Sequence, residues 1–113
     1  MKVTVANYGI GNILSVQRAL EHVGADVTFA DNAADIAAAD RLVVPGVGAF
    51  RKCMDAIAHF GLKDALIEFA HSGKPYLGIC VGMQMLMEKS YEFGEHAGLG
   101  LIAGDVRKID VPG

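Results

Sequence analysis

Short apolar runs alternate along this chain with longer stretches in which apolar residues recur at every third or fourth position. A short apolar run is typical of a strand buried on both faces, whereas the longer spacing is typical of an amphipathic helix. Five strands are predicted, over residues 2–6, 25–30, 41–44, 76–79 and 106–111. Strands alternating with helices, and apolar on both faces, predict a mostly parallel sheet covered on both sides, which is a doubly wound α/β fold.

The stretches with helical spacing are bounded by residues that start or stop helices. Asn12 can cap the first helix, and Gly24 ends it. Helices are predicted over residues 13–23, 33–39, 50–72 and 81–88. We expect Gly61 to interrupt the third of these, and the glycine-rich stretch 90–104 to form a loop.

Composition narrows the class of protein. With 113 residues, of which 52% are hydrophobic and 20% charged, the chain is typical of one folded domain. A net charge of −3 leaves no basic surplus to neutralise phosphates, which argues against nucleic acid as a partner. No apolar run approaches the roughly 18 residues that a membrane span needs, so we expect no membrane partner. Two cysteines are too few for a disulfide framework, and we expect a cytoplasmic protein.

Glycine is unusually frequent, at 14 of 113 residues. Clusters of glycine directly follow three predicted strands, within residues 9–11, 46–48 and 78–82. The carboxyl ends of parallel strands meet at one edge of a sheet, where ligands bind in this class of fold. The sequence therefore predicts that the three turns lie close together.

The turn 78–82, with the sequence GICVG, has the spacing of a nucleophile elbow between a strand and a helix. Glycines flank the nucleophile because the turn is tight and its neighbours approach closely. The N-terminus of the following helix favours the thiolate, the reactive form of cysteine. Cys80 is therefore a candidate nucleophile, the alternative being a buried structural cysteine. Cys53 lies inside a predicted helix without a neighbouring glycine, and we expect it in the core.

The turn 45–48, with the sequence PGVG, follows the neighbouring strand. Acyl transfer to a cysteine requires that a negatively charged oxygen be stabilised, usually by backbone N–H groups. We expect such groups in this turn, where Val47 and Gly48 lie, and at Val81, which follows the candidate nucleophile. An ordinary Pro-Gly turn is the alternative.

The first glycine-rich turn, NYGIGN at residues 7–12, does not match a nucleotide-binding loop. The dinucleotide motif needs a third glycine at the position of Leu14, and no phosphate-binding lysine motif is present. Asn12 is expected to be a helix cap or a polar interface residue.

A cysteine nucleophile usually needs a general base, most often a histidine. Three of the four histidines fall in predicted helices away from the glycine-rich edge. His96, near Glu92 and Glu95, is the only local candidate, and it is not a convincing one. No set of residues has the spacing of a metal site, so no metal is predicted.

The motifs NYGIGN, PGVGAF and GICVGMQ, in this order and spacing, resemble the triad (class I) glutamine amidotransferases. The last motif marks the wider family, and the first two narrow the resemblance to the glutaminase subunits of histidine biosynthesis or their close relatives. The resemblance covers the whole chain. It implies a flavodoxin-like doubly wound fold, hydrolysis of L-glutamine to glutamate and ammonia, and no cofactor.

The resemblance also assigns catalytic roles. Cys80 matches the residue that attacks the side-chain amide of glutamine and forms a glutamyl thioester. The N–H of Val81 matches a donor of the oxyanion hole. Val47 and Gly48 belong to the matching oxyanion strand, which in this family is thought to need a backbone flip before it becomes competent.

Further residues match binding positions of the family. Gly46, Gln84 and Glu92 match positions that hold the substrate glutamine. Asn12 matches a position near the interface with a cyclase (synthase) subunit, a (β/α)8 barrel that uses the ammonia. The implied partners are therefore this barrel, in a heterodimer, and L-glutamine.

The chain also departs from the family. The catalytic histidine and glutamate of the family lie in a later segment, similar to HPE, which is absent here. We therefore expect residues 1–113 to be the N-terminal part of a single amidotransferase domain, with an incomplete sheet and no activity alone. Two alternatives stay open: another cysteine-dependent amidotransferase or hydrolase of the same fold, or an inactive binding or regulatory module.

Overall fold

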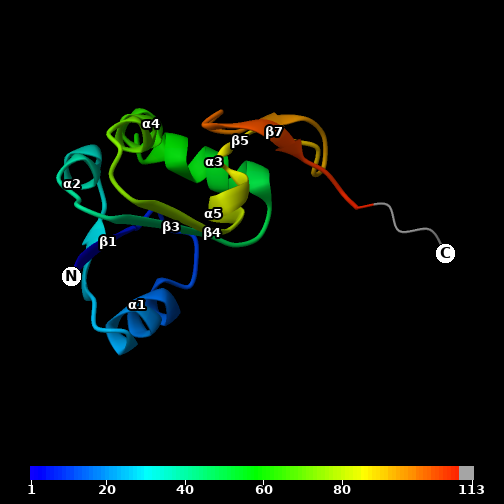
Figure 1. The fold of residues 1–113 in the computed structure, drawn as a ribbon. Helices are drawn as coiled ribbons and strands as arrows, with labels where there is room; N and C mark the ends of the chain where they lie inside the picture. The colour runs from blue at the N-terminus through cyan, green and yellow to red at the C-terminus, as the bar shows by residue number, and fades with distance from the viewer. Residues whose placement is uncertain (110–113) are drawn as a thin grey trace.

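A computed structural model describes residues 1–109 of the chain. Its centre is a sheet of four parallel strands in the order β2-β1-β3-β4 (Figure 1). The strands are β1 (Lys2–Ala6), β2 (Asp26–Ala30), β3 (Leu42–Gly46) and β4 (Tyr76–Cys80). Each lies within two residues of its predicted position, and the doubly wound α/β fold is confirmed.

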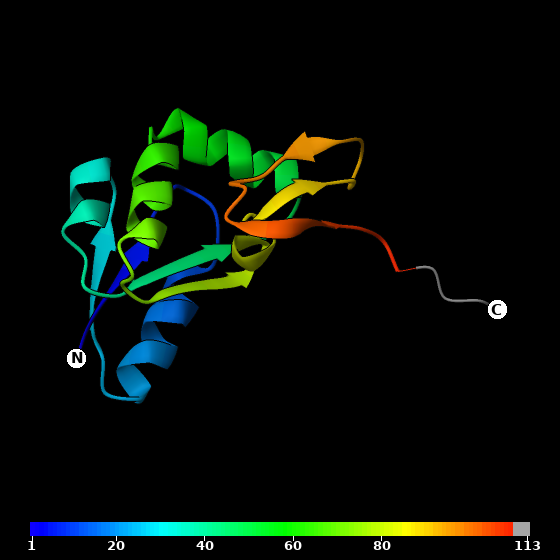
Figure 2. The ribbon, with the colours of Figure 1, turned by 45° about the horizontal axis from the view of Figure 1, so that its top comes forward.

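Helices cover both faces of this sheet (Figure 2). The helices described are α1 (Ile13–His22), α2 (Ala33–Ala37), α3 (Phe50–His59), α4 (Lys63–His71) and α5 (Val81–Gln84). Helix α1 lies on one face, and α2, α3 and α4 lie on the other. Consecutive residues of β3 contribute to different cores, since Val43 packs with residues of α1 whereas Val44 packs with residues of α3 and α4. This two-sided burial explains why the strands are apolar throughout.

The helix boundaries follow from local signals. The Asn12 side chain accepts a hydrogen bond from the N–H of Ser15 (3.3 Å), and Asn32 accepts one from the N–H of Asp35 (2.9 Å). These are the N-terminal caps of α1 and α2. Gly61, with φ of 68°, separates α3 from α4, so the predicted interruption is confirmed.

A second, smaller sheet follows α5. It contains β5 (Met87–Ser90), β6 (His96–Ala97) and β7 (Ile102–Val106), in the order β6-β5-β7. Strand β5 is antiparallel to β6 and parallel to β7. Figures 1 and 2 show this sheet beside α3, away from β2.

Three predictions for this part of the chain were wrong. The helix predicted over residues 81–88 ends at Gln84 and is replaced by β5. The loop predicted over 90–104 contains β6 and the start of β7. The last strand ends at Val106 instead of beginning there, and residues 110–111 of the predicted strand lie outside the described residues.

Tertiary hydrogen bonds explain these errors. The N–H groups of Leu99 and Leu101 donate to the carbonyls of Met85 and Leu86, at 2.7 and 2.8 Å, so those carbonyls do not bond within a longer helix. Gly98 permits the close approach, because a Cβ atom there would lie 2.2 Å from the carbonyl oxygen of Met87. The helical spacing of these residues is therefore overridden by hydrogen bonds with residues more than ten positions away.

Strand β4 lies at one edge of the four-stranded sheet. Its Leu77 is 54% exposed, although it is large and apolar.

None of the described helices is long and apolar enough to cross a membrane.

Candidate active site

The carboxyl ends of β1, β3 and β4 lie together, as the glycine clusters predicted. Gly46, at the end of β3, is the register partner of Cys80, at the end of β4. In the turn after β1, a Cβ atom at Gly11 would lie 3.5 Å from the ring of Pro45. The three glycine-rich turns therefore meet next to Cys80.

Cys80 joins β4 directly to α5 in a strained backbone conformation. Its φ is 55° and its ψ is −120°, a combination that glycine adopts far more readily than other residues. Such a conformation costs about 1–3 kcal/mol and persists only where the surrounding structure imposes it. The Cys80 side chain is exposed, so the alternative of a buried structural cysteine is wrong for this residue. The turn has the shape of the elbow that its spacing predicted.

The glycines on each side of Cys80 are required by close packing. A Cβ atom at Gly82 would lie 1.8 Å from the carbonyl oxygen of Val44, and one at Gly78 would lie 2.7 Å from the carbonyl oxygen of Gly82. Both distances are far below a van der Waals contact. The elbow is thus pressed against the end of β3, which determines where Cys80 can lie.

The turn 45–48 lies against the same elbow. A Cβ atom at Gly46 would lie 2.7 Å from the backbone nitrogen of Gly82 and 3.1 Å from the carbonyl carbon of Val81. Val47 and Gly48 continue from this contact into solvent, and both are exposed. The structure therefore brings the backbone of the turn 45–48 next to the start of α5, where Val81 lies.

Two buried side chains form hydrogen bonds with backbone carbonyls of the turn 45–48. The hydroxyl of Tyr8 donates to the carbonyl oxygen of Pro45, and the thiol of Cys53 donates to the carbonyl oxygen of Val47 at 3.3 Å. Both side chains are almost completely buried, which confirms the prediction that Cys53 is a core residue. Sequence reasoning missed both contacts, because Tyr8 lies 37 positions from Pro45 and nothing in the sequence marks the Cys53 thiol as a partner of the Val47 carbonyl.

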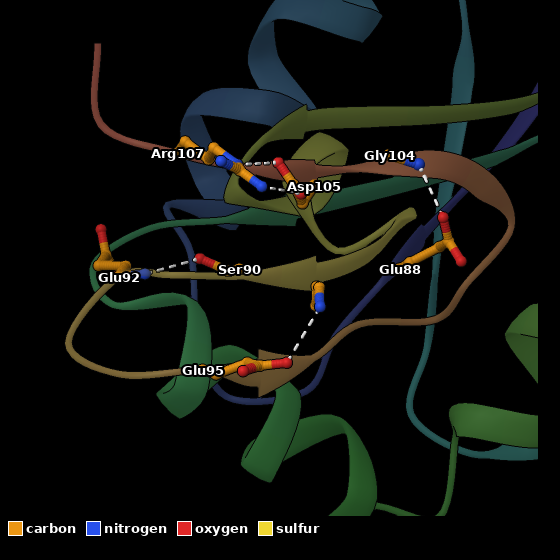
Figure 3. A network of polar contacts seen from close by, with 8 residues as sticks. Glu88, Ser90, Glu92, Glu95, Gly104, Asp105 and Arg107 are labelled. Carbon is orange, nitrogen blue, oxygen red and sulfur yellow. Dashed lines mark hydrogen bonds and ion pairs between the residues drawn. The ribbon is translucent and has the colours of Figure 1, made fainter. Parts of the chain in front are cut away.

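Gln84 and Glu92 line the same hollow of about 420 Å³, together with Tyr91, Phe93 and Arg107. One carboxylate oxygen of Glu92 accepts a hydrogen bond from the N–H of Phe50 at 2.9 Å. The N–H of Glu92 donates to the hydroxyl of Ser90 at 3.2 Å, as Figure 3 shows. Glu92 is therefore hydrogen-bonded to the first residue of α3, shortly after the turn 45–48.

Charged residues cover the second sheet beside this hollow. Arg107 forms two hydrogen bonds with the carboxylate of Asp105, at 2.8 and 3.1 Å (Figure 3). These bonds lower the pKa of Asp105 and raise that of Arg107. Lys89 and Arg107 both lie over the ring of Tyr91, at 5.2 and 4.9 Å from its centroid. Contacts with Tyr91 and Glu95 raise the pKa of Lys89.

A base for Cys80 is not among the described contacts. His96 lies in β6, and its Nε2 forms a hydrogen bond of 3.0 Å with the carbonyl of Phe93. Within residues 1–109, no histidine side chain forms a hydrogen bond with Cys80. In the same range no three side chains of His, Cys, Asp and Glu are grouped as a metal site would require.

Comparison with known proteins places this arrangement in a family. The family model of the CobB/CobQ-like glutamine amidotransferase domain matches residues 2–108. The chain belongs to this family. Cys80, at the elbow, thus lies in a domain of the glutamine amidotransferase type.

Curated relatives match closely over the length of this chain. The imidazole glycerol phosphate synthase subunit HisH of Wolinella succinogenes is 53% identical over 108 residues, covering 96% of this chain and 53% of the relative. HisH 1 of Legionella pneumophila is 50% identical over 110 residues, covering 97% and 51%. HisH of Salinibacter ruber is 52% identical over 103 residues, covering 91% and 47%. The chain thus spans about half the length of the curated relatives that it matches.

Solved structures share the fold. A crystal structure of a glutamine amidotransferase superposes with a TM-score of 0.72 at 19% identity, covering 87% of this chain and 52% of that one. A peptidase E protein from Listeria monocytogenes gives 0.69 at 17% identity, covering 89% and 62%. At these identities the similarity concerns the fold alone.

Proposed function

We propose that the full-length protein containing these residues is a glutaminase that supplies ammonia to a synthase in histidine biosynthesis. The observation that carries this proposal is Cys80, exposed at φ of 55° in an elbow between β4 and α5. The match to a glutamine amidotransferase domain supports the choice of glutamine, and the relatives named as subunits of imidazole glycerol phosphate synthase support the choice of the synthase.

In this proposal the reaction proceeds through a thioester. The Cys80 thiolate attacks the side-chain carbonyl carbon of glutamine, a C–S bond forms, and the carbonyl electrons move to oxygen. The N–H groups of Val81 and of the turn 45–48 stabilise that oxyanion. The C–N bond then breaks, and the nitrogen leaves as ammonia with a proton from the general base. Water attacks the thioester, which releases glutamate and restores the thiol.

Gly46, Gln84 and Glu92 are proposed to hold the substrate. Glu92 uses one carboxylate oxygen for the N–H of Phe50, and its second oxygen can accept from the α-ammonium group of glutamine. Gln84 lines the same hollow and can bond the polar backbone groups of the amino acid. Both assignments put the substrate between the elbow and the second sheet.

The general base and its carboxylate are proposed to come from outside residues 1–109. Residues 1–113 alone should therefore hydrolyse little or no glutamine. The partner that receives ammonia is proposed to be a (β/α)8-barrel cyclase in a cytoplasmic heterodimer, with Asn12 near their interface.

The test is Cys80→Ser in the full-length protein with its synthase partner. We expect glutamine hydrolysis to fall by at least about 10³-fold, since the serine hydroxyl is a much weaker nucleophile than the thiolate. Synthesis from added ammonium salt should continue, because that reaction bypasses the thioester. A glutaminase rate that survives the substitution would contradict the role of Cys80.

A further inference from the structure

Two buried donors bind two successive parts of the turn 45–48. Tyr8, in the turn after β1, donates its hydroxyl hydrogen to the carbonyl oxygen of Pro45. Cys53, one turn into α3, donates its thiol hydrogen to the carbonyl oxygen of Val47. Tyr8 is 1% exposed and Cys53 is fully buried, so neither bond competes with water.

These bonds determine the direction of the N–H groups in the turn. In a trans peptide the C=O and the N–H of the same unit point in opposite directions. Because the Val47 carbonyl points toward buried Cys53, the N–H of Gly48 points away from it. Because the Pro45 carbonyl points toward buried Tyr8, the N–H of Gly46 points away from Tyr8.

Both donors keep their hydrogen at neutral pH. Burial raises the pKa of the Tyr8 hydroxyl, and the nearby Cys53 thiol raises it further. Burial is also the largest influence on Cys53 and raises the pKa of its thiol. Neither group is therefore poised to act as a nucleophile or base, and each is available as a donor.

We propose that Tyr8 and Cys53 are positioning residues that orient the Pro45–Gly46 and Val47–Gly48 peptide units for stabilising an oxyanion at Cys80. This inference rests on the proposed function, because it assumes that the turn faces a tetrahedral intermediate. It adds to the site two buried residues, one from a glycine-rich turn and one from the interior of a helix.

The experiment compares two reactions of Cys80 in the full-length protein. Acetylation by p-nitrophenyl acetate passes through a tetrahedral oxyanion, whereas alkylation by iodoacetamide does not. The ratio of the two rates therefore reports oxyanion stabilisation and is independent of how much thiolate is present. Both rates are followed by mass spectrometry of the Cys80 peptide, with N-acetylcysteine as the reference thiol.

Four variants separate positioning from packing. Tyr8→Phe removes the donor and keeps the ring, and Cys53→Ala removes the thiol. Cys53→Ser keeps a hydrogen-bond donor at nearly the same volume. Tyr76→Phe is the matched control, since the buried hydroxyl of Tyr76 has no hydrogen-bond partner among the described residues.

We expect the wild-type ratio to exceed that of N-acetylcysteine by about 10-fold or more, as one or two oriented N–H donors would give. Tyr8→Phe and Cys53→Ala should each lower the ratio by about 5-fold, with unchanged alkylation rates. Cys53→Ser should restore most of the ratio, and Tyr76→Phe should leave it at the wild-type value.

Two results would overturn the inference in distinguishable ways. In the first, the wild-type ratio is raised and the ratio of Tyr8→Phe stays within about twofold of it, which shows that the turn acts without its buried donors. This conclusion holds even where Cys53→Ala fails to fold. A wild-type ratio equal to that of N-acetylcysteine overturns the oxyanion assignment itself. The proposed function then still stands or falls on glutamine hydrolysis by Cys80→Ser.

Discussion

The two cysteines of this chain lie in opposite surroundings, although they belong to segments that contact each other. Cys53 is fully buried inside α3, in ordinary helical backbone, and donates a hydrogen bond to Val47. Cys80 is exposed at a turn, with a strained backbone and close contacts on both flanks. Burial raises the pKa of Cys53 and keeps its thiol protonated, whereas solvent and the start of α5 surround Cys80.

The comparison shows that the backbone, rather than the residue type, separates a structural thiol from a candidate nucleophile. An exposed thiol can be reached by a substrate, whereas a thiol buried between packed helices cannot. Four measurements test this contrast between the two cysteines.

The largest expected difference is in the rate of alkylation. We expect iodoacetamide to modify Cys80 at the rate of an accessible thiol, and Cys53 at least about 10³-fold more slowly, because Cys53 reacts only when the core opens. Peptide mapping after timed quenching measures both rates in one sample. Comparable rates at the two sites would contradict the buried placement of Cys53.

The next effect concerns the packing that forces the turn at Cys80. Gly82→Ala puts a Cβ atom 1.8 Å from the Val44 carbonyl oxygen, and we expect a loss of at least about 3 kcal/mol in the free energy of unfolding. Urea denaturation measures it. Gly73→Ala is the control for backbone conformation: the φ of Gly73 is positive, at 83°, unlike that of Gly82, and no atom lies within 4 Å of the new Cβ, so it should cost only about 1 kcal/mol. A loss in Gly82→Ala no larger than that of Gly73→Ala would contradict the clash with the Val44 carbonyl oxygen.

A pH dependence should follow from the buried thiol. The folded pKa of Cys53 is raised, so the stability that its protonated form contributes is fully present below the unfolded pKa. That stability is lost as pH rises from the unfolded value of about 8.5 toward the folded value, at up to about 1.4 kcal/mol per pH unit. Urea unfolding between pH 7.5 and about 9.5, below the ordinary titration of tyrosine, measures the slope.

Cys53→Ala is the control for that slope. This variant is expected to be less stable at every pH, but its stability should fall less steeply above about pH 8.5. Parallel slopes for the two proteins would mean that Cys53 does not titrate differently in the folded and unfolded chains.

The smallest effect is the strain at the elbow. Cys80→Gly relieves a backbone conformation that costs about 1–3 kcal/mol, but it also makes the unfolded chain more flexible. We expect a net gain of about 1 kcal/mol in the free energy of unfolding. Cys80→Ala keeps the Cβ atom and with it the strain, so it should stay within about 0.5 kcal/mol of wild type. A loss of stability in Cys80→Gly would mean that the turn is not strained.

Much of the first four-fifths of the fold could be predicted from the sequence. The strands are apolar on both faces, and the capping residues Asn12 and Asn32 and the break at Gly61 are local signals that the structure retains. The elbow was also predictable, since its glycines are spaced around Cys80 by the same close packing that the structure shows.

The second sheet could not be predicted in this way. Residues 85–88 have helical spacing, but their carbonyls bond to the N–H groups of residues 98–102 instead. Gly98 is where that pairing comes closest, and this glycine was interpreted only as the sign of a loop. Gln84 and Glu92 lie in one hollow because of this second sheet. Before the structure, only the resemblance of the chain to the amidotransferase family indicated that these two residues share a site.

The positions of the strands and helices and of the turn that carries Cys80 could be predicted from the sequence alone. Periodicity and glycine spacing are local patterns, and the alternation of strands with helices then implies a parallel sheet. The groups that support that turn became visible only in the tertiary structure. Tyr8 donates to the Pro45 carbonyl and Cys53 to the Val47 carbonyl, and Glu92 accepts from the N–H of the first residue of α3. Each of the contacts from Tyr8 and Glu92 joins residues at least 37 positions apart, and such pairs meet only when the sheet and its helices have packed.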